Sequence, residues 1–169
     1  MPVVATNYER AFAERPDVYA AWGELLGAIK ANMDLRRYEL ATLAAARRLR
    51  SSYCSLAHGQ VLLEQYGEPV LEIATDRDSA GLGAVDVAVM DLAERVVDDA
   101  TKITDADLQR LRDLGLTDPE IMDVILAAAV RSFWTKTLDS LGVQPDATYA
   151  EMAPELLEVL VVGRPIAKT

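Results

Sequence analysis

The sequence contains few of the residues that most often build reactive or metal-binding sites. Its 169 residues include one cysteine and one histidine. A single cysteine excludes a disulfide within the chain, and one cysteine with one histidine cannot supply the three or four ligands of a thiolate and imidazole metal site. We therefore expect no internal disulfide, no metal and no other bound cofactor.

Basic residues and long apolar runs are also scarce. There are 17 Lys and Arg against 27 Asp and Glu, so the net charge is −10 at pH 7. Such a chain has no excess of cations to offset phosphates, which argues against nucleic acid or an anionic membrane surface as a partner. The longest apolar run, Val124 to Val130, is far shorter than the roughly 20 residues that a membrane-spanning helix needs.

The N-terminal residues lack the basic start and apolar stretch of a secretory signal. This feature and the low cysteine content predict a cytoplasmic protein. Hydrophobic residues make up 51% of the chain and charged residues 26%, as in ordinary globular proteins. The length suits one domain with a substantial core and is short for two. We expect a single domain over residues 1–169.

Helix signals dominate the sequence. Apolar residues recur at helical spacing, and the segments begin at capping residues or prolines and end at glycines. The only run rich in β-branched residues, 159–162, has no partner strand or hairpin turn. These patterns predict an all-α protein with helices near 17–29, 34–49, 52–66, 86–100, 104–115, 117–141 and 154–160, and with a short helix and a loop within 68–84.

One segment combines residue types that support nucleophilic chemistry. Cys54 and His58 are four residues apart, so they share one face of the predicted helix. With Ser51 as the N-cap, Cys54 takes the third helical position, where unpaired N–H groups and the positive helix end favour a thiolate. Glu39, on the preceding helix, would orient the His58 imidazole if the two helices fold back antiparallel. Nucleophile, base and orienting carboxylate are then all present.

Spacing alone leaves a structural interpretation open for each of these residues. A lone cysteine on a helix is more often a small buried hydrophobe than a nucleophile. A lone histidine is more often a core or surface residue, and most glutamates on helices face water. Another line of evidence is needed to choose between Cys54 as a reactive thiol and Cys54 as a packing residue.

The segment from Glu39 to His58 resembles the signature of the carboxymuconolactone decarboxylase/alkylhydroperoxidase D-like family. That signature is a glutamate, then C-x-x-C, then three residues and a histidine. Aligned on Glu39, the second motif cysteine falls at Cys54 and the histidine at His58. The likeness extends over roughly residues 20–140. It implies the single-domain alkylhydroperoxidase D-like helical fold and a homo-oligomer, either a trimer or a hexamer.

This chain departs from the signature at one position. The first motif cysteine aligns with Ser51, so the motif is S-x-x-C. In the dithiol members the second cysteine is implied to react with peroxide and the first to resolve the sulfenic acid. The resemblance therefore implies a peroxidase-like enzyme in which Cys54 attacks an organic hydroperoxide. His58 would accept the thiol proton, Glu39 would hold or relay it, and an external thiol would serve as reductant.

Two alternatives come from different functional classes. The other branch of the family decarboxylates a small lactone by acid/base chemistry, for which Glu39 and His58 would suffice and Cys54 would be inessential. The chain could instead be a non-catalytic helical oligomer that serves as a scaffold or binding protein, with Cys54 as a packing residue. A buried and unreactive thiol would favour this last alternative.

Overall fold

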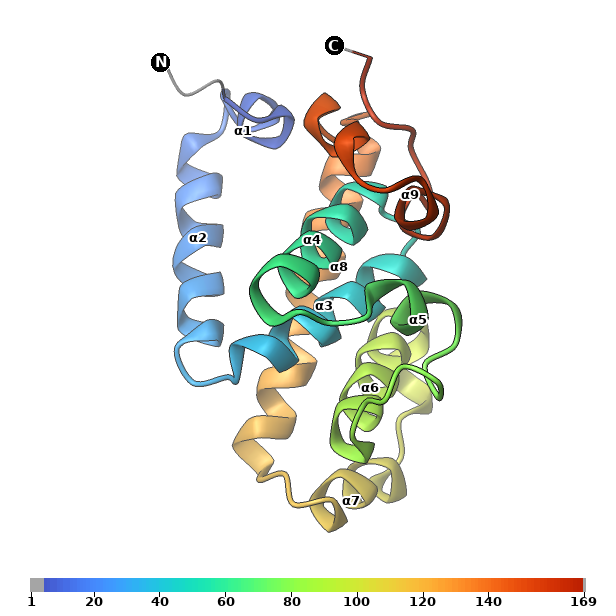
Figure 1. The fold of residues 1–169 in the computed structure, drawn as a ribbon. Coiled ribbons are helices and arrows are strands. Elements are labelled where there is room, and N and C mark those ends of the chain that lie inside the picture. Colours follow the sequence, from blue (N-terminus) through green and yellow to red (C-terminus); the bar gives the residue numbers. More distant parts are fainter. Residues whose placement is uncertain (1–4, 169) are drawn as a thin grey trace.

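The computed structural model describes residues 5–168, and within that range it contains helices and no strand (Figure 1). The all-α class predicted from the sequence is confirmed. No helix in the described range is both long and apolar enough to cross a membrane. The elements are α1 (Asn7–Ala11), α2 (Pro16–Lys30), α3 (Leu35–Arg48), α4 (Ser52–Tyr66), α5 (Val70–Thr75), α6 (Ala84–Asp99), η1 (Ala100–Lys102), α7 (Asp105–Asp113), α8 (Asp118–Ser140), η2 (Ala147–Glu151) and α9 (Pro154–Leu160).

Helix α3 forms the centre of the fold. Every residue from 38 to 46 is buried, and α4, α6 and α8 all lie against this helix (Figure 1). The alanines of α3 permit this arrangement, because small side chains let neighbouring helices approach closely and fill the interior without voids. Residues on α3 are therefore fixed from several sides, which suits a helix that carries part of a site.

Local capping sets the beginnings of several helices. Thr117 caps α8 and forms a capping box with Glu120, and Thr104 does the same for α7 with Asp107. These reciprocal bonds satisfy N–H groups that a helix leaves unpaired at its first turn. Pro16 is the first residue of α2. The helix starts predicted at these positions are confirmed.

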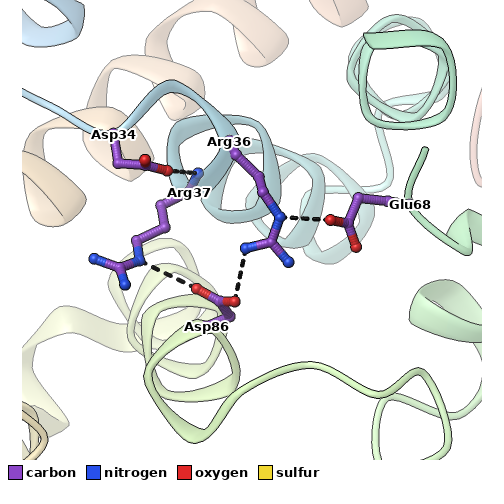
Figure 2. Close-up of polar contacts among 5 residues, drawn as sticks. All are labelled: Asp34, Arg36, Arg37, Glu68 and Asp86. Atoms are coloured by element: carbon purple, nitrogen blue, oxygen red, sulfur yellow. Dashed lines mark hydrogen bonds and ion pairs between the residues drawn. The ribbon is translucent and has the colours of Figure 1, made fainter. Parts of the chain in front are cut away.

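A network of five residues joins the start of α3 to α6 and to the segment that follows α4 (Figure 2). Arg36 contacts Glu68 at 2.5 Å and Asp86 at 2.7 Å, while Nε of Arg37 donates to Asp86 at 3.1 Å. Asp34 caps the helix by accepting from the backbone N–H of Arg37 at 2.8 Å. Asp86 is largely buried, so its two arginine partners compensate a charge that would otherwise be costly in the interior.

The turn between α3 and α4 reverses the chain within a few residues. Arg50 adopts the left-handed conformation, with φ of 58°, and the backbone N–H of Ser51 donates to the carbonyl of Ala46 at 2.9 Å. This is the usual way in which a helix ends and the chain turns back. Helix α4 consequently folds back along α3, which was the condition for a Glu39–His58 contact.

The C-terminal segment lies directly on this turn. The N–H of Gly163 donates to Oγ of Ser52 at 2.8 Å, and the guanidinium of Arg47 binds the backbone carbonyls of Ala74 and Val159. The approach at Gly163 is so close that a Cβ there would lie 1.9 Å from the carbonyl oxygen of Arg50. Only glycine fits this position, and the tail thereby covers the beginning of α4.

Candidate active site

The structure brings together two of the three residues predicted from the sequence motif. Ser51 occupies the N-cap of α4 and Cys54 the third helical position, as predicted, although the Ser51 side chain makes no capping hydrogen bond. Nδ1 of His58 lies 2.5 Å from Oε2 of Glu39. The imidazole and the carboxylate are therefore paired across the interface of α3 and α4.

The Glu39 carboxylate is held from two sides inside the protein. Its residue is only 5% exposed, and while one oxygen meets His58, the other lies 3.8 Å from Nζ of Lys30 on α2. The Lys30 ammonium also lies 4.7 Å from the centre of the Tyr38 ring, within the range of a cation–π contact. This arrangement compensates the buried carboxylate and directs it at the imidazole.

His58 is held in the form that can accept a proton. Burial lowers the pKa of His58 below its ordinary value of 6.5, the charge of Arg131 lowers it further, and the hydrogen bond with Glu39 opposes these effects only in part. The imidazole is therefore neutral at neutral pH. A carboxylate can only accept, so Nδ1 carries the hydrogen and Nε2 keeps a free lone pair.

This shift predicts a pH dependence of stability. Because the folded pKa of His58 lies below the unfolded value of 6.5, the contribution of His58 to stability is complete above about pH 6.5 and is lost as the pH falls towards the folded value. We expect a loss of at most about 1.4 kcal/mol per pH unit in that window. Urea unfolding of the wild type and of His58→Gln from about pH 7 down to about pH 5 measures it.

His58 is the only histidine in the chain, and glutamine keeps an N–H donor for the Glu39 carboxylate. The difference between the two proteins therefore reports the loss of the imidazole. Parallel stability curves for wild type and variant would contradict the proposed charge state.

Cys54 is a free thiol and only 3% exposed. No hydrogen bond joins its sulfur to His58, although both residues lie in the described part of the chain. A proton passes between the two side chains only through a bridging water or after one side chain moves towards the other. Burial by itself favours the packing interpretation of Cys54, so the neighbours of the sulfur decide which interpretation applies.

One such neighbour is Arg131, which the sequence analysis missed. It lies on α8 and is 3% exposed. Its Nη1 is 3.7 Å from Sγ of Cys54, and its Nη2 donates to the Tyr38 hydroxyl at 2.8 Å. An apolar packing role for Cys54 would not require a cation beside the sulfur. A signal was present in the sequence, because Arg131 stands seven residues after Val124 and seven before Leu138, on the apolar face of a predicted helix.

An apolar groove of about 360 Å³ runs between α2 and α8, next to the site. Trp22 belongs to its lining and stacks on Trp134 with ring centres 3.7 Å apart, and Trp134 shares a core cluster with Cys54. The groove therefore borders the core cluster that contains Cys54. It is lined by Val18, Ala21, Trp22, Leu25, Ile29, Leu126, Ala129, Val130 and Phe133.

No metal ligand set is formed by the described residues, since among residues 5–168 no three Cys, His, Asp or Glu side chains are grouped so that they could hold an ion. What the site does offer is acid/base and thiol chemistry. It holds a neutral imidazole paired with a carboxylate, and one helical turn away a thiol in contact with a guanidinium.

The sequence matches no protein-family model and no curated protein. Several solved structures are similar in fold, and two of them are as follows. One is the alkylhydroperoxidase AhpD core, an uncharacterized peroxidase-related protein from Ralstonia eutropha JMP134, with a TM-score of 0.77, 21% identity, and coverage of 96% of this chain and 85% of that chain. The other is an uncharacterized peroxidase-related protein from Silicibacter sp. TM1040, with a TM-score of 0.79, 19% identity, and coverage of 87% and 80%. The chain therefore has the alkylhydroperoxidase D-like helical fold.

Proposed function

We propose that the protein is a thiol-dependent peroxidase-like oxidoreductase that reduces organic hydroperoxides through Cys54. The observation that carries this proposal is the contact of the Cys54 sulfur with Arg131, one helical turn from the His58–Glu39 pair. A nucleophilic sulfur needs a route for its proton and a stabilised negative charge, and these residues provide both. The peroxidase-related names of the two structural neighbours agree with this choice.

The proposed oxidation of Cys54 by a hydroperoxide uses only the groups at the site, the peroxide itself and protons exchanged with solvent. The Cys54 thiol proton leaves through the His58–Glu39 pair, and the thiolate attacks the distal oxygen of the hydroperoxide. The S–O bond forms as the O–O bond breaks, so sulfur is oxidised by two electrons and the peroxide is reduced. A proton that re-enters from solvent through the same pair neutralises the leaving alkoxide. The products are Cys54 sulfenic acid and an alcohol.

Regeneration requires a second thiol from outside the chain, because Cys54 is the only cysteine. An external thiol attacks the sulfenic acid, releasing water and leaving a mixed disulfide. A second external thiol then frees Cys54 and departs as a disulfide. The cytoplasmic setting predicted from the sequence is part of this proposal, since reduced thiols are abundant there.

We further propose that the protein is a homo-oligomer, as the resemblance implied. In support, the groove between α2 and α8 is lined by apolar residues, and its rim exposes large ones: Leu25 is 51% exposed, and Leu126 and Phe133 are also exposed. Apolar surface of this kind is stabilised when a second protein surface covers it.

Brief exposure of the protein to cumene hydroperoxide, with dimedone as a trap, tests the proposed chemistry. We expect intact-mass analysis to show one dimedone adduct per wild-type chain and none in Cys54→Ser, because sulfenic acid is the species that dimedone captures. His58→Gln should form the adduct about 100-fold more slowly, the scale of a lost general acid/base relay, because the variant cannot deliver a proton to the leaving alkoxide.

Cys54→Ser is a matched control, since it keeps the size and burial of the side chain. A folded wild-type protein that gains no adduct would defeat the peroxidase proposal. If lactone decarboxylation were instead found and survived Cys54→Ser, the acid/base alternative based on Glu39 and His58 would replace it.

A further inference from the structure

Arg131 is a buried cation that has no carboxylate partner among the residues the structure describes. Its side chain is nearly inaccessible, and among residues 5–168 its polar contacts are the Tyr38 hydroxyl and the Cys54 sulfur. Its Nε has no partner. Arginine stays protonated in proteins, so a full positive charge resides in the core. Leaving such a charge uncompensated is strongly destabilising, and the structure must therefore contain a counter-charge.

Three titratable groups near Arg131 or Cys54 cannot be the counter-charge, because they are neutral at neutral pH. Burial raises the pKa of Tyr38, and it raises the pKa of Tyr149 to about 12, so both phenols keep their protons. Burial lowers the pKa of His58, so the imidazole carries no charge either. None of the three supplies a negative charge to Arg131.

The remaining charged groups of the cluster are already paired with each other. Lys30, from α2, is a second cation and lies against Glu39. The other Glu39 oxygen accepts from His58. Of the two side chains that contact Arg131 in the described part of the chain, the Tyr38 phenol is neutral, so Cys54 is the contacting group that can carry a balancing negative charge.

We infer that Arg131 and Cys54 form a buried guanidinium–thiolate pair at neutral pH, in which Arg131 holds the sulfur ionised. The S–H bond breaks, its electron pair stays on sulfur, and the proton leaves through the His58–Glu39 pair to solvent. The inference rests on the proposed function for the use of this thiolate in catalysis. It makes Arg131 a catalytic residue, because the guanidinium touches the reacting atom.

The geometry of the guanidinium suits this role. Arginine presents its donors as a planar fork, and here one arm is fixed on the Tyr38 hydroxyl at 2.8 Å while the other faces Sγ at 3.7 Å. The donor in the second contact must be the guanidinium, since arginine has no acceptor. A thiolate accepts such a bond far better than a thiol does. The Nε–H of Arg131 remains an unused hydrogen-bond donor in the described structure.

The charge state can be measured directly because the chain has one cysteine. The ultraviolet absorbance of the thiolate is recorded at neutral pH, with Cys54→Ser as the blank. We expect a thiolate signal in the wild type and its loss in Arg131→Met and in Arg131→Gln, which keeps a donor for Tyr38 without the charge. The rate of Cys54 alkylation by iodoacetamide should fall about tenfold or more in both variants.

Arg48→Met is the matched control, because it removes the same charge from an exposed arginine paired with Asp98, and it should leave the signal unchanged. Absence of a thiolate in the wild type would overturn the inference, even if neither Arg131 variant folds. A folded Arg131 variant with the wild-type signal would overturn it too.

The two proposals can fail separately. A wild-type thiolate that no hydroperoxide oxidises would defeat the proposed function and leave the Arg131–Cys54 pair standing. A neutral resting thiol that is nevertheless oxidised to sulfenic acid would defeat the pair and leave the proposed function standing.

Discussion

Replacing Ser51 with cysteine is expected to give the protein an internal resolving thiol and to raise peroxide turnover with a dithiol reductant about tenfold or more. Ser51 is the N-cap of α4, three residues before Cys54, and this is the spacing at which two cysteines can bridge in C-x-x-C motifs. The Ser51 side chain is buried and makes no capping hydrogen bond, so its replacement by the similar cysteine side chain should disturb the start of α4 little. Turnover rises because the Cys54 sulfenic acid is then resolved by a thiol of the same chain.

Intact mass distinguishes the outcomes. After hydroperoxide treatment Ser51→Cys should lose two hydrogens, whereas the wild type should gain one oxygen. Ser55→Cys is the matched control, because Ser55 is equally buried. In Ser55→Cys the two cysteines would be neighbours in the sequence, with Cα atoms only about 3.8 Å apart. This is too close for ordinary disulfide geometry, so the control should form no internal disulfide. A folded Ser51→Cys protein that forms no internal disulfide would show that Cys54 does not form the sulfenic acid proposed above.

Replacing Gly163 with alanine is expected to lower the free energy of unfolding by about 2–4 kcal/mol. The new Cβ would lie 1.9 Å from the carbonyl oxygen of Arg50, and backbone atoms cannot yield as a flexible side chain can. The C-terminal segment would have to lift from the turn between α3 and α4. It would then lose its hydrogen bond to Ser52.

Urea denaturation measures this effect, with Gly23→Ala as the control. A Cβ at Gly23 meets no atom within 4 Å, and alanine is the better helix former, so this variant should gain about 0.5–1 kcal/mol. Equal denaturation midpoints for Gly163→Ala and the wild type would show that the tail does not rest on the turn as described.

The features that could be predicted from the sequence are those set by residues close together along the chain. The capping box of Thr117 and Glu120 lies within four residues, and the start of α8 follows from it. The Glu39–His58 contact was predicted because one sharp turn joins two helices whose lengths and faces were readable. Helix α1 was not predicted, since five residues are too few to show an apolar period, although Thr6 forms a capping box there as well.

The features that the sequence did not predict depend on contacts between distant parts of the chain. Arg131 and Cys54 are 77 positions apart, and no local pattern states which helix faces will meet. The docking of Gly163 on the turn before α4 has the same origin, because its partner Ser52 is 111 positions away. Charged residues on apolar helix faces are the one sequence feature that would have directed attention to Arg131.

The stacking of Trp22 on Trp134 also determines how the protein emits light. These are the only two tryptophans in the chain. One lies on α2 and the other on α8, with ring centres 3.7 Å apart, and Trp134 shares the core cluster of Cys54. All of the indole fluorescence therefore originates from one stacked pair, half of which belongs to the core cluster of Cys54. Any movement of α2 away from α8 would unstack the rings, so the protein carries an intrinsic optical reporter of the contact between these two helices.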